Sequence, residues 1–110
     1  MAPAMQSPCL YANSRELAYS WKMNSIAAER ELKVLANRRR LAILDFLRRK
    51  KEADVTAISQ AIRLSFTSTS KHLNMLERAG FIGKEQRSVN VFYHLSPSAP
   101  KILAAVFNTF

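Results

Sequence analysis

Short polar and cationic side chains gather on one side of a helix predicted between Ser65 and Ala79. Thr69, Leu73 and Leu76 recur at helical spacing and fall on one face of that helix. The opposite face can form hydrogen bonds with base edges and phosphates in a DNA major groove. The residues that we predict to contact DNA from this segment are Ser65, Phe66, Thr67, Ser68, Ser70, Lys71, His72 and Asn74.

Both ends of this helix carry sequence signals. Ser65 is placed to cap the first turn, because its side-chain oxygen can accept a hydrogen bond from a free backbone N–H. Gly80 follows the last turn and tolerates the positive φ that often ends a helix there. An ordinary solvated amphipathic helix would show the same features, so the flanking segments have to decide between the two interpretations.

A second short helix is predicted just upstream, over residues 53–64, with four apolar side chains on one stripe. Only three or four residues lead from Ile62, the last residue of that stripe, to the helix start at Ser65 and Phe66. Two short helices linked this closely are typical of a helix-turn-helix motif, which we place at about residues 54–79.

A hairpin is predicted downstream, at about residues 81–95. From Val89 to Leu95 every second residue is apolar (Val89, Val91, Tyr93 and Leu95), which is the period of a strand with one buried face. Phe81 to Glu85 is expected to form the partner strand, with the tip of the hairpin near Gln86-Arg87-Ser88. We expect Arg87 to contact the flanking minor groove of DNA from this tip.

Three segments in this order resemble the ArsR/SmtB-type winged-helix transcriptional regulators. They are residues 32–44 (LKVLANRRRLAIL), then 70–73 (SKHL) with Leu76 and 79–82 (AGFI), and finally 91–95 (VFYHL). The resemblance runs from about residue 31 to about residue 97. It implies a mainly α fold with a small β-hairpin, a winged helix-turn-helix with N- and C-terminal dimerisation helices. The implied activity is sequence-specific binding of double-stranded DNA by a homodimer, often altered by a metal or another effector.

The chain departs from the pattern of that family at two places. Phe66 stands where the family often carries glutamine, so an apolar base contact is expected there. The hairpin tip has Arg87-Ser88 in place of the frequent Gly-Arg pair. The operator sequence, the sign of regulation and the identity of any effector are open at this stage.

Composition favours a polyanionic partner. The chain of 110 residues has a formal net charge of +9, and its 48% hydrophobic fraction is typical of a globular protein. Residues 30–51 carry nine Lys or Arg against two acidic residues, a net of 9 − 2 = +7, so we expect much of the phosphate attraction there. Arg48 to Lys51 are also interpretable as a solvated helix end. No apolar run is long enough to span a bilayer and no signal peptide is apparent, which predicts a cytoplasmic protein without a membrane partner.

One domain is expected over residues 13–110, after a flexible tail at 1–12. A first helix is predicted to start near Asn13, with Glu16 completing a capping box, and its continuity past Asn24-Ser25 is left open. A last helix is predicted at about 98–110. We assign the apolar faces of both to a dimer interface, with packing inside one subunit as the alternative. The interface residues are Leu17, Trp21, Ile102, Leu103, Val106, Phe107 and Phe110.

Chemistry beyond binding has little support in the sequence. Cys9 is the single cysteine, and His72 and His94 are too scattered to define a metal site. The two places where the resembled family binds metal lack their ligands here, so we expect no metal, no cofactor and no enzymatic activity. The alternatives to DNA binding are a protein-interaction module that kept the winged helix and an RNA-binding adaptor.

Overall fold

The structure is a computed structural model, and it describes the backbone from Ser14 to Phe110 and the side chains from Asn24 onward. The predicted tail at 1–12, the helix start at Asn13 and the side chains of Leu17 and Trp21 therefore lie outside the described residues. By its internal contacts the chain divides into two compact units, Met1–Arg30 and Glu31–Phe110. The helix-turn-helix and the hairpin lie entirely within the second unit.

Helix α2, Ser14–Leu35, is a single helix, which answers the question that the sequence left open at Asn24-Ser25. Helix α3, Arg38–Lys50, follows after a two-residue break. Asn37 caps α3, because its backbone is extended and its side-chain oxygen accepts hydrogen bonds from the backbone N–H groups of Arg39 and Arg40. Ile43, Leu44 and Leu47 are buried, so α3 is the central helix that the apolar sequence predicts.

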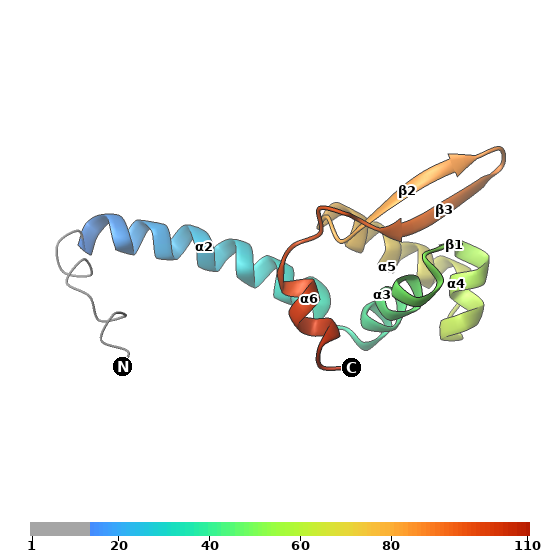
Figure 1. Cartoon of the computed structure of the whole chain (residues 1–110), viewed down its shortest axis with the longest axis horizontal. Helices are drawn as coiled ribbons and strands as arrows, with labels where there is room; N and C mark the ends of the chain where they lie inside the picture. Colours follow the sequence, from blue (N-terminus) through green and yellow to red (C-terminus); the bar gives the residue numbers. More distant parts are fainter. Residues whose placement is uncertain (1–13) are drawn as a thin grey trace. The chain divides into compact units, whose positions relative to one another are not determined.

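The helix-turn-helix is formed by α4, Val55–Ile62, and α5, Phe66–Arg78 (Figure 1). Ser65 caps α5 as predicted, with its hydroxyl oxygen 3.1 Å from the backbone nitrogen of Ser68. Gly80 has a φ of +85°, the conformation that was expected after the last turn. Thr69 and the two leucines of the predicted inner face are fully buried.

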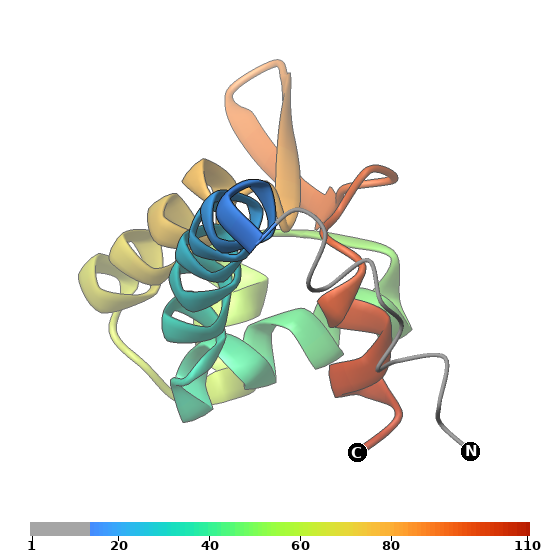
Figure 2. The ribbon, with the colours of Figure 1, turned by 90° about the vertical axis from the view of Figure 1, so that its left-hand side faces the viewer.

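The sheet has three antiparallel strands in the order β1-β3-β2. Strand β1, Glu52–Asp54, was not predicted, whereas β2, Ile82–Arg87, and β3, Asn90–Leu95, form the predicted hairpin. The tip is at Ser88 and Val89 and not at residues 86–88, because the pairing of Arg87 with Asn90 extends β2 further than expected. Strand β1 pairs only with residues 92–94 of β3, so the outer half of the hairpin projects past it (Figure 2).

The core of the second unit joins α3, α4 and α5 to the base of the sheet. Phe81 is fully buried between α5 and β2 and is not part of a strand, in contrast to the prediction. Helix α6 spans only Ile102–Phe107 and is shorter than the predicted 98–110. Two prolines explain the late start, because Pro97 and Pro100 lack the backbone N–H and disfavour a helical conformation in the residue before them. Leu103 of α6 is buried in the core of its own subunit.

Candidate nucleic-acid interface

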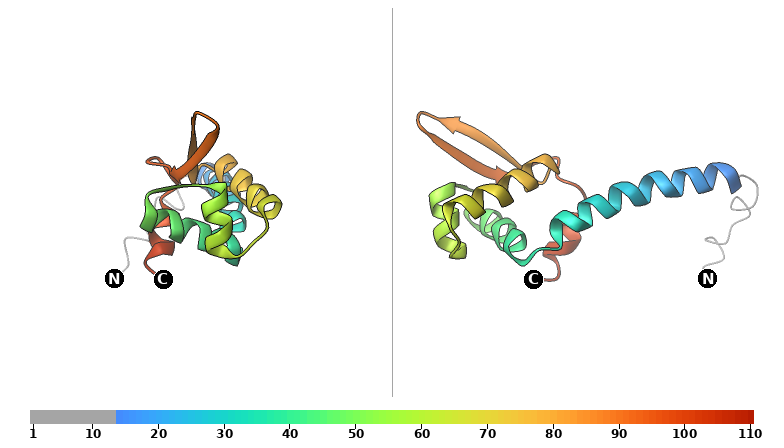
Figure 3. Two further views of the ribbon diagram at one scale, coloured as in Figure 1. Left: turned by 90° about the vertical axis from the view of Figure 1, so that its right-hand side faces the viewer. Right: turned by 180° about the vertical axis from the view of Figure 1, so that it is seen from behind.

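The outer face of α5 is polar, basic and exposed. Thr67, Lys71 and Asn74 are exposed, and their side chains make no hydrogen bond or ion pair with any described residue. Ser68 and Ser70 are half-buried beside them. The hydrogen-bonding capacity of this face is therefore available to a partner outside the subunit. The hairpin extends next to α4 and α5, so one partner can contact both α5 and the hairpin (Figure 3).

Two apolar side chains are exposed near the start of α5. Phe66 is the first residue of the helix and is 59% exposed, and Val89 at the hairpin tip is 87% exposed. Both line a hollow of about 190 Å³ between the starts of α4 and α5 and strand β3. An aromatic ring exposed at this position can make an apolar contact with a partner outside the subunit.

His72 points inward and is held by Arg40 of α3. The Arg40 Nε donates a hydrogen bond to His72 Nδ1 at 3.2 Å, and the same guanidinium donates to the backbone oxygen of Val34 at 3.0 Å. Burial lowers the pKa of His72 below its usual value, and the positive charges of Arg40 and Arg39 lower it further. His72 is therefore neutral at pH 7, and it positions α5 against α3 instead of facing outward.

Arg87 is held by carboxylates of the protein itself. Its guanidinium forms a two-pronged ion pair with Glu52, with N–O distances of 2.7 and 2.8 Å, and contacts Glu85 at 2.9 Å. It also lies 4.9 Å from the centre of the Phe92 ring. Since β3 lies between β1 and β2, the Arg87 side chain crosses the sheet from the tip end of β2 to β1.

The titration behaviour of this cluster follows from the ion pairs. The hydrogen bonds from Arg87 hold the pKa of Glu52 below its usual value, and the charges of Arg87 and His94 act in the same direction. The hydrogen bonds to Glu52 and Glu85 raise the pKa of Arg87. In the free chain Arg87 of the hairpin is thus paired with two carboxylates of the protein, and its contact with DNA stays a prediction.

The basic residues at the end of α3 also have internal partners. Asp45 pairs with both Arg48 and Arg49, which lie three and four residues further along the helix, about one turn away. The Arg48 guanidinium lies 4.9 Å from the ring centre of Phe107 and 5.9 Å from that of Phe110. Arg48 therefore connects α3 with Phe107 and Phe110. Lys50 and Lys51 are exposed, and neither forms an ion pair with a described residue.

The structure thus separates the predicted DNA contacts into two groups. Residues around the start and outer face of α5 lie together, whereas His72 and Arg87 contact side chains of the protein. Sequence reasoning missed the partners of these two residues, Arg40 and Glu52. Arg40 lies at helical spacing before the apolar face of α3, and this position was the available signal that its side chain has a partner inside the protein. No local feature of the sequence indicates that Glu52 is the partner of Arg87.

Neither a membrane span nor a metal cluster is found in the described part of the chain. None of its helices has the length and apolar character to cross a bilayer. No three of its histidine, cysteine, aspartate or glutamate side chains are grouped so that they could hold a metal ion. Cys9 lies outside the described residues.

Comparison with known proteins identifies the family. The family model described as bacterial regulatory protein, arsR family, matches residues 37–84, from the cap of α3 into β2. The transcriptional activator HlyU of Vibrio cholerae is 38% identical over 80 residues, which are 73% of this chain and 73% of the relative.

Solved structures agree with this match. Reduced HlyU from Vibrio cholerae has a TM-score of 0.70 and 33% identity, over 82% of this chain and 94% of that chain. NolR from Sinorhizobium fredii has a TM-score of 0.71 and 29% identity, over 83% and 91% of the two chains. The homodimeric winged helix-turn-helix DNA-binding domain of a possible ArsR-family regulator from Mycobacterium bovis has a TM-score of 0.66 and 30% identity, over 80% and 78%. The chain therefore belongs to the arsR family of bacterial regulatory proteins and has its winged helix-turn-helix fold.

Proposed function

We propose that this protein regulates transcription by binding a near-palindromic operator as a homodimer, with one α5 in each of two successive major grooves. The observation that carries the proposal is the outer face of α5, where Thr67, Lys71 and Asn74 are exposed and have no partner within the described residues. The Vibrio cholerae relative is named a transcriptional activator, and the Mycobacterium bovis domain is named DNA-binding and homodimeric. Both names support the proposal.

Base reading is assigned to the start of α5. Short hydroxyl and amide side chains form hydrogen bonds with base edges, and Phe66 supplies an apolar contact. Lys71 adds a cation that binds a base or a phosphate. Ser65 and Ser68 lie in the first turn, where backbone N–H groups and hydroxyls are well placed for the DNA backbone.

We assign the contact between the two subunits to the apolar face of α6. Leu103 is already covered by the core, but Ile102, Val106 and Phe107 are only partly buried and Phe110 is 54% exposed. Pairing of two such faces about a two-fold axis would bury the exposed remainder. It would also fix the spacing of the two recognition helices at about 34 Å, one turn of DNA.

Selection of bound fragments from a random duplex pool tests binding, specificity and symmetry together. We expect enrichment of a near-palindrome, and Lys71→Ala should weaken binding to it by roughly 1 to 3 kcal/mol. Lys101→Ala, a matched loss of an exposed lysine outside α5, should leave binding unchanged. Absence of any enriched motif, or steady binding across a range of salt concentrations, would contradict the proposal in favour of apolar docking to a protein.

The dimer has its own test in Val106→Glu. Val106 is already partly packed against its own core, so the main cost is the charge that Glu would place in the interface, once from each subunit of the two-fold pair. The dissociation constant of the dimer should rise on the order of a hundredfold or more. Ala105→Glu is the control, because it adds the same charge at an exposed position on the other side of α6. Sedimentation gives the mass, and circular dichroism shows whether the variant is folded. A folded Val106→Glu monomer that binds the full palindrome with unchanged affinity would refute the assignment.

A further inference from the structure

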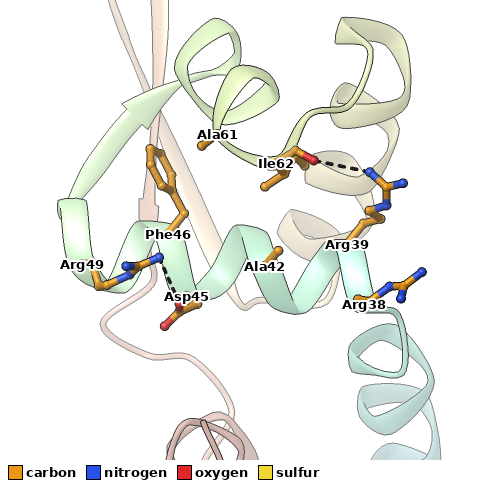
Figure 4. Close-up of a pocket in the computed structure, with 8 residues that line it drawn as sticks. All are labelled: Arg38, Arg39, Ala42, Asp45, Phe46, Arg49, Ala61 and Ile62. Carbon is orange, nitrogen blue, oxygen red and sulfur yellow. Dashed lines mark hydrogen bonds and ion pairs between the residues drawn. The ribbon is translucent and has the colours of Figure 1, made fainter.

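A groove lies between α3 and the end of α4, on a part of the second unit that the DNA-binding proposal does not use (Figure 4). Its volume is about 550 Å³, within the roughly 300 to 1,000 Å³ of pockets for small organic ligands. One face of α3 forms most of it and the last turn of α4 closes it. The lining residues are Arg38, Arg39, Ala42, Asp45, Phe46, Arg49, Ala61 and Ile62.

The floor of the groove is apolar, and two alanines make it deep. Ala42 points from α3 towards α4, and Ala61 and Ile62 line the groove from the α4 side (Figure 4). A larger side chain at either alanine would fill the space between the two helices. Phe46 adds an aromatic wall that is only partly buried, so a flat apolar group can pack there.

The two ends of the groove differ in charge. Arg49 at one end is paired at 3.2 Å with Asp45, a carboxylate that it shares with Arg48, so the positive charge at this end is partly compensated. At the other end, Arg38 is exposed, and the guanidinium of Arg39 donates a long hydrogen bond of 3.4 Å to the backbone oxygen of Ile62. Among the described residues no carboxylate pairs with Arg38 or Arg39, so this end carries two uncompensated positive charges next to an apolar surface.

We infer that the groove binds a small organic anion with a flat apolar body, such as an aromatic carboxylate. The carboxylate lies between Arg38 and Arg39, where guanidinium groups can bind it in two-pronged fashion, and the body packs on Ala42 and Phe46. A DNA phosphate would satisfy the arginines but would leave the apolar floor uncovered. The combination of apolar lining and a few convergent charges is that of a small-molecule site.

The groove is also adjacent to the helix that we assign to DNA reading. Ile62, whose carbonyl accepts the bond from Arg39, is the last residue of α4 and lies three residues before the cap of α5. Arg40, the next residue along α3, donates to His72 of α5. A carboxylate on Arg39 competes with the Ile62 carbonyl at the turn between the two helices.

The test is a titration of the full chain, without DNA, with naphthoate and with the uncharged naphthalenemethanol, followed by amide NMR spectra. Naphthoate should saturate at one equivalent per subunit and shift the amide signals of Ala42, Phe46 and Ile62. The alcohol should bind about tenfold more weakly or worse, since it lacks the charge-assisted hydrogen bonds. Because no DNA is present, the result is independent of the proposed regulatory function.

Variants locate the site. Arg39→Gln removes a charge, and Ala61→Leu fills the groove while keeping every charge; each should weaken naphthoate binding about tenfold or more. Lys50→Gln removes the same charge from an exposed position of α3 outside the groove and should change binding less than about twofold. Amide spectra of the free variants show that each is folded. Unsaturable binding, equal affinity for the alcohol, or full binding by Ala61→Leu would overturn the inference.

Discussion

Phe66 is the most informative position for testing how α5 reads DNA. An aromatic side chain presents about 200 Å² of surface, and since Phe66 is 59% exposed, about 120 Å² remains to be buried on binding. At about 25 cal/mol per Å², complete burial against DNA is worth up to about 3 kcal/mol per half-site. A single thymine methyl group accounts for about 0.8 kcal/mol of this, or about fourfold in affinity.

A double-mutant cycle isolates this contact. Replacing each thymine of the selected half-site by deoxyuridine removes one methyl group at a time, and fluorescence anisotropy gives the affinity. At one position, the replacement should weaken the affinity of the wild type about fourfold and leave the affinity of Phe66→Ala unchanged. Met75→Ala is the matched control, since Met75 is an exposed apolar residue near the other end of α5 and is 41% exposed. If every deoxyuridine affects wild type and Phe66→Ala equally, Phe66 does not read a methyl group.

Three further predictions follow from the internal contacts. Arg87→Ala and Glu52→Gln should both weaken binding to all DNA sequences, because each breaks the ion pair that holds the wing; tighter binding by Glu52→Gln would show instead that Arg87 contacts phosphate. Because the pKa of His72 is lowered in the folded state, the unfolded state takes up the proton first as the pH falls. The free energy of unfolding, measured with urea, should therefore be constant above about pH 6.5 and decrease below it. His72→Gln should remove this decrease, and His94→Gln should retain it. The buried hydroxyl of Thr69 has no hydrogen-bond partner within the described structure, so Thr69→Val should raise the free energy of unfolding by about 1 kcal/mol without changing DNA affinity.

The parts of the fold that rest on local signals could be predicted from the sequence. Ser65 caps its helix through the backbone N–H of Ser68, only three residues away, and the inner face of α5 follows from helical spacing alone. The alternation from Val89 to Leu95 likewise predicts a strand, because a strand with one buried face shows period two. Each of these patterns is complete within one segment of chain.

The remainder depends on contacts between distant segments. Strand β1 has three residues, too few to show any alternation, and it exists only because β3 pairs with it. Arg87 and its partner Glu52 are 35 residues apart, and Arg40 and His72 are 32 apart. No periodicity links such pairs, so residue type alone assigned Arg87 and His72 to DNA, and packing gave them other partners.

These contacts change how the net charge of +9 should be interpreted. Arg40 and Arg87 are bonded within the protein, and Arg48 is shared between Asp45 and two aromatic rings. Each phosphate that a protein neutralises contributes about −0.9 to the slope of log affinity against log salt, so cations with internal partners add little. Lys71 is the exposed cation at the centre of the proposed reading face. We therefore expect recognition through this face to depend more on the fit of Phe66 and the short polar side chains to base edges than on the number of positive charges.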